Sequence, residues 1–221
     1  MTDSNQTNTP STTSSASPSP TANPDAGLVY GSDGLARPAW AMTSPLLQEY
    51  YDTEWGMPIH EESGLLERLC LESFQSGLSW ATVLRKREAF REAFAGFDAD
   101  AVAAFDEEDV ARLMDNAAII RNERKIRAAI TNARATVALR EKGGLDEFLW
   151  GFMPEENLHP HTLADIPKFI PEAKDMSAAL KKEGFTFVGP VTCFSLMEAI
   201  GMVDAHLVGS HRRGCSGIWR D

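Results

Sequence analysis

Two helices joined by a tight bend are the strongest structural signal in this chain. The first helix is predicted from Leu65 to Phe74, where apolar residues recur at helical spacing, and Gly77 interrupts it. Ser79 can cap a second helix that begins at Trp80. Glu72 lies among the apolar positions of the first helix. Its carboxylate is therefore predicted to point towards a covered place rather than into water.

Glu72 and Trp80 would stand at the two ends of this bend. A carboxylate accepts N–H donors and an indole stacks on an electron-poor ring, so the pair could bind a flat polar ring. The alternative is that Glu72 is a solvated surface acid and Trp80 a core residue. For this fragment alone the alternative is stronger, because acids on helices usually face water.

The rest of the chain also carries helical rather than strand-like patterns. Ser44 followed by Pro45 is a helix start, since the serine can cap and the proline lacks an N–H that would stay unpaired there. Asp98 and Asp106 are placed to cap later helices. Further helices are predicted at residues 80–94, 108–116, 126–137, 148–152, 173–182 and 191–200. No segment alternates convincingly in strand fashion, so the predicted fold class is all-α.

The N-terminal part differs in composition from the rest of the chain. Residues 1–36 are dominated by Ser, Thr, Pro, Asn and Gly, and such a segment buries too little apolar surface to offset its ordering entropy. A disordered tail over residues 1–36 and one folded domain over residues 37–221 are therefore predicted. The tail lacks the basic start and apolar core of a secretion signal, and no later apolar run is long enough to cross a membrane.

Charge and cysteine content narrow the class of protein. A formal net charge of −11 at pH 7 argues against a generic nucleic-acid binder, because phosphate contacts require a basic face. It leaves room for a localised contact. The basic turn at residues 117–125 joins two predicted helices and could present backbone N–H groups to a phosphate, or it could be an ordinary helix connection. Three cysteines are an odd number, which argues against a disulfide framework and favours a reducing cytoplasm.

Six segments together resemble the 3-methyladenine DNA glycosylase I family, within the helix-hairpin-helix DNA glycosylases. They are YYDTEWG (50–56), LESFQSGLSWATVLRKRE (71–88), IIRNERKI (119–126), NAR (132–134), LKKEGFTFVGP (180–190) and GMVDAH (201–206). The resemblance covers about residues 38–209. It implies a monofunctional hydrolase that flips 3-methyladenine out of double-stranded DNA and cleaves its N-glycosidic bond. A monomer without a cofactor is expected.

The resemblance also implies roles for individual residues. Glu72 matches the carboxylate that reads the base, and it is the candidate catalytic residue. The residues that match positions around the flipped base are Tyr50, Trp80, Trp40 and Ser195. Those that match positions facing the DNA are Gly77 and Leu78 at the bend, and Arg121, Asn122 and Lys125 in the hairpin.

Two departures from the family pattern affect the site. Leu47 stands where an aromatic pocket residue is expected, which could loosen base selection. Glu123 stands where the hairpin often has arginine, which should weaken phosphate contact.

A third departure concerns a zinc site that commonly joins the two ends of the domain in the family. The matching positions hold Pro38, Tyr51, His206 and Ser210, and a single histidine cannot hold the metal. A metal-free protein is therefore predicted, with Tyr51 filling the vacated space and its hydroxyl group hydrogen-bonded to His206 or Ser210. A substitute site made of His206, His211 and Cys215 is the alternative.

The leading hypothesis is an active DNA-3-methyladenine glycosylase. Three alternatives stay open: a glycosylase that prefers a different alkylated base, a lesion-binding protein that flips bases without cleaving them, and an interaction scaffold. Because Glu72, Trp80 and Tyr50 occur together, the scaffold is disfavoured.

Overall fold

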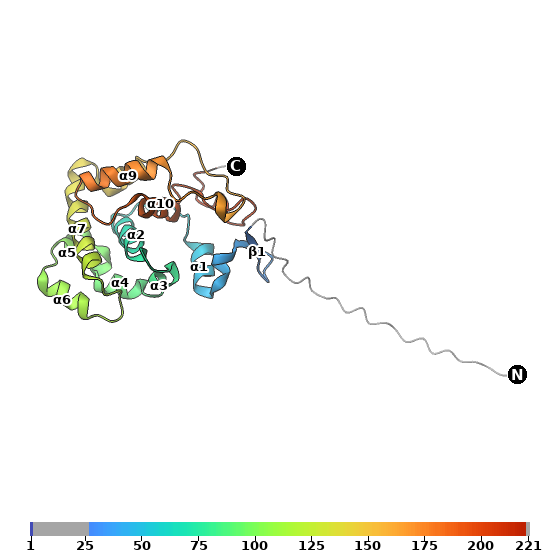
Figure 1. The fold of residues 1–221 in the computed structure, drawn as a ribbon, viewed down its shortest axis with the longest axis horizontal. Helices are drawn as coiled ribbons and strands as arrows, with labels where there is room; N and C mark the ends of the chain where they lie inside the picture. The colour runs from blue at the N-terminus through green and yellow to red at the C-terminus, as the bar shows by residue number, and fades with distance from the viewer. Residues whose placement is uncertain (2–26, 220–221) are drawn as a thin grey trace.

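The computed structural model describes residue 1 and residues 27–219, and helices make up nearly all of its regular structure (Figure 1). The α-helices are α1 Pro45–Thr53, α2 Glu62–Gln75, α3 Trp80–Arg85, α4 Arg87–Ala93, α5 Ala99–Ala103, α6 Glu107–Asp115, α7 Glu123–Leu139, α8 Gly144–Trp150, α9 Pro171–Lys182 and α10 Pro190–Ala199. The short 3-10 helices are η1 Ala39–Thr43, η2 Ala95–Phe97, η3 Arg140–Lys142 and η4 Leu163–Asp165. Within residues 27–219 no helix is both long and apolar enough to cross a membrane.

Helix α2 is the centre of the core. It packs against α3, α7, α8 and α10, and Figure 1 shows it among α3, α7 and α10. Its apolar residues are fully buried, and so are the polar residues Arg68, Glu72 and Ser73. A helix buried on most of its circumference places any charged group that it carries inside the protein. The sequence-based prediction that Glu72 points to a covered place is therefore confirmed.

Side-chain caps mark where five of the ten α-helices in residues 27–219 begin: α1, α3, α5, α6 and α7. The Ser44 hydroxyl accepts a hydrogen bond from the amide of Leu47, and Asp106 forms a reciprocal capping box with Asp109. The Ser79 hydroxyl caps α3 as predicted, and Gly77 between the helices has a φ of 83°, which favours glycine. The predicted helix over residues 80–94 is instead two helices, because the backbone of Lys86 (φ −101°, ψ 0°) breaks the run without a glycine or proline to signal it.

The predicted boundary of the disordered tail is wrong. Residues 27–36 are ordered, since strand β1 (Leu28–Tyr30) pairs in antiparallel register with β2 (Ala36–Pro38). Leu28 is buried in a small cluster with Leu207 from the other end of the domain. The Arg37 guanidinium is buried and donates hydrogen bonds to two carboxylates, those of Asp33 and Asp52. Asp52 and Leu207 lie outside this segment, so its composition alone could not reveal those contacts. The prediction for residues 2–26 falls outside the described residues.

Candidate active site

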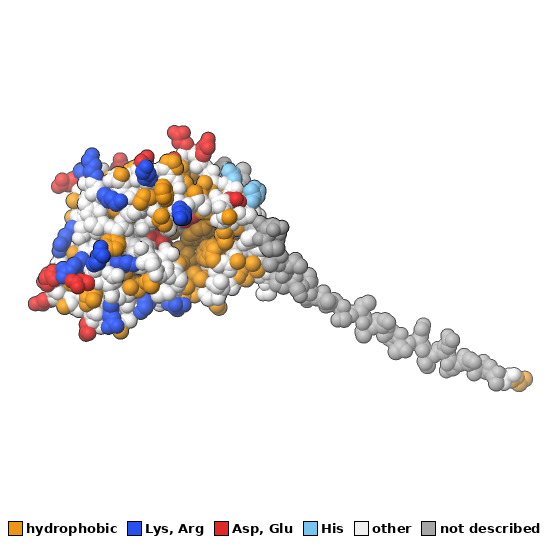
Figure 2. All heavy atoms as spheres, in the orientation of Figure 1, with side chains coloured by type: hydrophobic (Ala, Val, Ile, Leu, Met, Phe, Trp, Pro, Cys, Tyr) orange, Lys and Arg blue, Asp and Glu red, His pale blue; other side chains and the backbone are white. Residues whose placement is uncertain are grey.

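A cavity of about 230 Å³ lies where α1, α2, α3 and α10 meet the C-terminal segment. Figure 2 shows a hollow with many hydrophobic side chains between α10 and α1. Glu72, predicted to recognise the base, and the four residues predicted to surround it all line the cavity; the four are Trp40, Tyr50, Trp80 and Ser195. The five residues come from five different elements, η1, α1, α2, α3 and α10, so only the tertiary structure brings them together.

Two aromatic rings form one wall of the cavity. The rings of Tyr50 and Trp80 have centroids 5.4 Å apart and are tilted by 46°. The buried guanidinium of Arg68 lies 5.3 Å from the Tyr50 ring centroid and 5.7 Å from that of Trp80. It also donates a hydrogen bond of 2.9 Å to the Tyr50 hydroxyl oxygen, so it holds that ring in place. Arg68 thus organises the aromatic wall without itself lining the cavity.

Glu72 is the buried carboxyl group of this cavity. It is 6 % exposed, and no hydrogen bond or ion pair joins its side chain to another described residue. Burial raises the pKa of Glu72 to about 7, although the nearby positive charge of Arg68 acts in the opposite direction. A buried acceptor without a protein partner is costly unless a ligand supplies N–H donors.

A second carboxyl group, Glu198 on α10, lines the same cavity. The resemblance did not single it out. Burial raises the pKa of Glu198 to about 8, and the like charge of Glu72 adds to the rise. A signal was present in the sequence, because Glu198 is the lone charged residue in the apolar run of residues 191–200. Gln75 and Trp55 also line the cavity and were not predicted.

The bend between α2 and α3 borders a second hollow of about 320 Å³ that adjoins the first. Glu72, Gln75 and Ser195 line both, while Gly77 and Leu78 line only the second. Leu78 is 42 % exposed although it is a large apolar residue. The exposed Leu78 therefore borders the hollow that adjoins the cavity, and its predicted contact with DNA stays a prediction.

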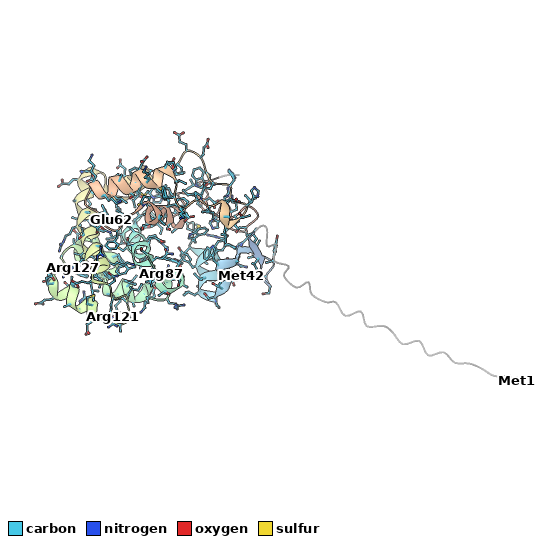
Figure 3. All side chains as sticks on the ribbon, in the orientation of Figure 1. Met1, Met42, Glu62, Arg87, Arg121 and Arg127 are labelled. Carbon is cyan, nitrogen blue, oxygen red and sulfur yellow. The ribbon has the colours of Figure 1, made fainter. Side chains whose placement is uncertain are left out.

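The hairpin before α7 carries Arg121 and Asn122, two of the residues predicted to contact DNA. Arg121 is exposed and lies at the periphery of the molecule (Figure 3). The Asn122 side chain caps α7 by accepting from the amide of Lys125. Glu123, the residue in place of the family's arginine, forms an ion pair with Arg127 on the next turn of α7.

The side chain of Lys125 has a different placement from the one predicted. It is only 7 % exposed, and its Nζ donates hydrogen bonds to the carbonyl oxygens of Phe74, at 2.9 Å, and Ser76, at 2.7 Å. The ammonium group therefore satisfies the carbonyls at the C-terminal end of α2 instead of facing a phosphate. The sequence-based assignment of a phosphate contact is corrected accordingly: Lys125 supports the bend that carries Gly77 and Leu78.

The two ends of the domain meet around Tyr51. Its hydroxyl group is hydrogen-bonded to the Ser210 hydroxyl, and its ring packs edge-on against His206 at 5.2 Å between centroids. The predicted contact between Tyr51 and Ser210 is confirmed. The His206 ring fits closely over Gly56, where a Cβ atom would stand 2.4 Å from its Cε1 atom. A glycine at position 56 is therefore needed for the C-terminal segment to dock.

The residues present do not fit a zinc ion. Among residues 27–219, no group of three or more His, Cys, Asp and Glu side chains is arranged to hold a metal. In the substitute set, Cys215 Sγ lies 4.0 Å from His206 Nε2. His211 turns both ring nitrogens elsewhere, Nδ1 to the carbonyl oxygen of Ala36 at 2.9 Å and Nε2 to Asp52 at 3.1 Å. A histidine engaged in this way cannot complete a tetrahedral site with the other two.

Comparison with known proteins places this arrangement in a family. Residues 40–213 match the family model described as methyladenine glycosylase. The chain belongs to the methyladenine glycosylase family. DNA-3-methyladenine glycosylase 1 of Escherichia coli (strain K12) is 44% identical over 178 residues, which cover 79% of this chain and 95% of that protein. DNA-3-methyladenine glycosylase of Haemophilus influenzae (strain ATCC 51907 / DSM 11121 / KW20 / Rd) is 40% identical over 172 residues, 76% of this chain and 92% of that protein.

Solved structures of methyladenine glycosylases share the fold. A crystal structure of 3-methyladenine DNA glycosylase I has a TM-score of 0.77 at 42% identity, and the match covers 80% of this chain and 99% of that one. The Staphylococcus aureus enzyme, described in terms of 3-methyladenine recognition, has a TM-score of 0.75 at 34% identity over 79% of this chain and 95% of that one. The predicted all-α glycosylase fold is confirmed, with the β1–β2 hairpin as an addition.

One departure from the pattern of the methyladenine glycosylase family lies outside the cavity. Leu47 is buried against Tyr50 and Leu84 and is not among the residues that line the cavity. It therefore supports the aromatic wall from behind. The expectation that it loosens base selection stays a prediction.

Proposed function

We propose that this chain excises 3-methyladenine from double-stranded DNA by hydrolysing the N-glycosidic bond, with Glu72 as the residue that reads the base. The observation that carries the proposal is a buried carboxyl group without a protein partner, in a cavity walled by Tyr50 and Trp80. The cavity offers one aromatic wall on which a planar ring can stack and a carboxyl group that can accept a hydrogen bond from its amino group. All the residues that line it come from one chain, so a monomer suffices for the site.

The chemistry of the lesion explains why so few groups are needed. Methylation at N3 makes adenine cationic, so the base is already activated as a leaving group. When the bond from the sugar C1′ to the base breaks, its electron pair moves onto the base and neutralises it. Water then adds to C1′, and its proton passes to solvent. No lysine lines the cavity, so the described residues offer no amine that could attack the sugar. This supports a monofunctional hydrolase.

Glu72 distinguishes the cationic base from ordinary adenine. Above a pH of about 7 its side chain is ionised, and burial deprives that charge of water. A positively charged ring with N–H donors restores the lost stabilisation, whereas a neutral base restores less of it. Selection therefore acts when the flipped base enters the cavity, before bond cleavage.

Contact with DNA is proposed at the bend and the hairpin. In this proposal the exposed Leu78 enters the gap in the duplex, and the backbone N–H groups at the start of α7, next to Arg121 and Asn122, bind a phosphate. The net charge of −11 predicts modest affinity that falls with added salt.

Release of free base from methylated DNA tests the proposal. The wild-type protein should release 3-methyladenine, identified by chromatography. Glu72→Gln should excise at least about a hundredfold more slowly while keeping its folded structure, because glutamine cannot carry the charge. The exposed Glu141→Gln variant is the matched control and should excise at the wild-type rate. Tight binding of methylated DNA by the wild type without base release would favour a non-catalytic lesion-binding protein.

A further inference from the structure

Glu198 is a second carboxyl group in the base-binding cavity that the proposed mechanism does not use. It projects from α10, whereas Glu72 projects from α2, and these two helices pack against each other. Both side chains line the cavity, and neither is joined by a hydrogen bond or ion pair to another described residue. Glu198 is half-buried, and both carboxyl groups open into the cavity from different helices without a protein partner, so a bound ligand can contact both.

No positively charged side chain lines this cavity to balance the pair. Arg68 lies behind the aromatic wall, where it is engaged by the Tyr50 hydroxyl group. His206 also lines the cavity, but burial lowers its pKa, with Asp204 opposing that effect, so its ring is neutral at pH 7. Burial raises the pKa of Tyr50, which keeps that hydroxyl group neutral too. On α9, the positive charge of Lys181 acts on the thiol of Cys193 on α10 and lowers its pKa, against the larger effect of burial.

We propose that Glu198 is a second base-contacting residue, and that the carboxyl pair of Glu72 and Glu198 makes the cavity selective for positively charged bases. This inference rests on the proposed function, because it assigns the charge of the ligand in the same cavity. A cationic ring between the two carboxyl groups replaces the counter-charge that the protein does not supply.

The pair holds protons when the cavity is empty. Burial raises the pKa of Glu72 to about 7 and that of Glu198 to about 8. A cationic base favours the ionised form of both groups, so its binding releases a proton to solvent and tightens as the pH rises through this range. Bond cleavage then leaves a neutral base, and the pair takes up a proton again. The carboxyl pair that selects the cationic substrate therefore binds the neutral product base less tightly.

A matched pair of small probes isolates the charge of the ligand. The 3,9-dimethyladeninium cation carries a permanent positive charge and has a methyl group in place of the sugar. Its 3-deaza analogue has carbon at position 3, so it has nearly the same shape and is neutral. Titration calorimetry of both probes against the full chain at pH 8.5 gives the ratio of the two affinities.

The wild-type protein should prefer the cation, and Glu198→Gln should reduce that preference at least about tenfold, as expected for loss of one nearby charge. Affinity for the neutral analogue should change little. The exposed Glu141→Gln variant removes the same charge outside the cavity and should keep the wild-type ratio. Glu72→Gln should retain a rise of cation affinity with pH, shifted to lower pH because Glu198 has lost its charged neighbour.

An unchanged ratio in a folded Glu198→Gln variant would overturn the role of Glu198. Base release by the wild type from methylated DNA, measured alongside, shows whether the proposed function itself holds. If the Glu198→Gln variant does not fold, the Glu72→Gln variant decides. Glu198 is then the remaining carboxyl group in the cavity, so binding of the cation should still release a proton, measured by calorimetry in two buffers of different ionisation enthalpy. Binding of the cation by Glu72→Gln without proton release would refute the inference.

Discussion

Lys125→Met should loosen the bend that carries Gly77 and Leu78 without removing a phosphate contact. In the wild type, Lys125 Nζ joins the start of α7 to the carbonyl oxygens of Phe74 and Ser76 at the end of α2. Methionine preserves much of the apolar stem but donates no hydrogen bond. The substitution therefore isolates the ammonium group.

The structure sets the size of the effect. A hydrogen bond from a charged group contributes about 1.5–3 kcal/mol. The lost bond at Ser76 is partly replaced by water because this residue is exposed, whereas Phe74 is fully buried and its carbonyl stays unpaired. We therefore expect the free energy of unfolding to fall by about 2–3 kcal/mol rather than by twice that amount.

Two measurements separate this role from phosphate binding. Urea unfolding reports stability, and the slope of DNA affinity against salt concentration counts phosphate contacts, at about 0.9 per contact. Lys125→Met should lower stability and leave the slope unchanged. The exposed Arg121→Met is the matched control, which should lower the slope and leave stability unchanged.

The result that would refute this reasoning is the reverse pattern for Lys125. Stability within about 0.5 kcal/mol of the wild type, together with a slope reduced by about 0.9, would mean that Lys125 contacts a phosphate after all. Affinity for free 3-methyladenine gives a further check. It should survive the substitution, because Lys125 does not line the cavity.

Three further predictions concern the cavity and the junction of the chain ends. The pKa of Glu72 is raised from 4.5 to about 7, so the native state keeps a proton that the unfolded state has lost. The contribution of Glu72 to the free energy of unfolding should therefore fall as pH rises from 4.5 to 7. At pH 8, Glu72→Gln should be about 2–3 kcal/mol more stable than the wild type by urea unfolding. An equal or lower stability of the variant would contradict the argument that burial raises the pKa of Glu72. Trp80→Ala should weaken binding of free 3-methyladenine by about 1–3 kcal/mol in calorimetry, and Tyr50→Ala should act in the same direction; unchanged affinities would mean the base binds elsewhere. Tyr51→Phe removes the hydrogen bond to Ser210 and should lower the free energy of unfolding by about 1 kcal/mol in urea unfolding. A chelator should leave the melting temperature of the wild type unchanged, and stoichiometric zinc in elemental analysis would contradict the prediction of a metal-free protein.

Local features of this protein could be predicted from its sequence because they depend on neighbouring residues. Serine and aspartate caps, the glycine at the bend and the apolar spacing of the helices concern hydrogen bonds and contacts within a few residues. The burial of Glu72 followed from its place among apolar positions of α2. The family could be identified for a similar reason, since its motifs are short segments in a fixed order.

Features that join distant segments were decided only by the tertiary structure. The β1–β2 hairpin is ordered because Arg37 reaches Asp52 and Leu28 reaches Leu207, and nothing in residues 27–36 encodes those partners. Lys125 was predicted to be a surface cation in a basic turn, but the C-terminal end of α2 packs against it, and carbonyl oxygens there accept hydrogen bonds from its ammonium group.

The cavity itself shows this division most clearly. Glu72 could be found from its motif, whereas Glu198 gained its position only when α10 packed against α2. Its raised pKa depends on burial and on the charge of Glu72, and both are properties of the packed structure. A sequence specifies which groups can ionise, but the surroundings that set their charge arise from residues more than a hundred positions apart.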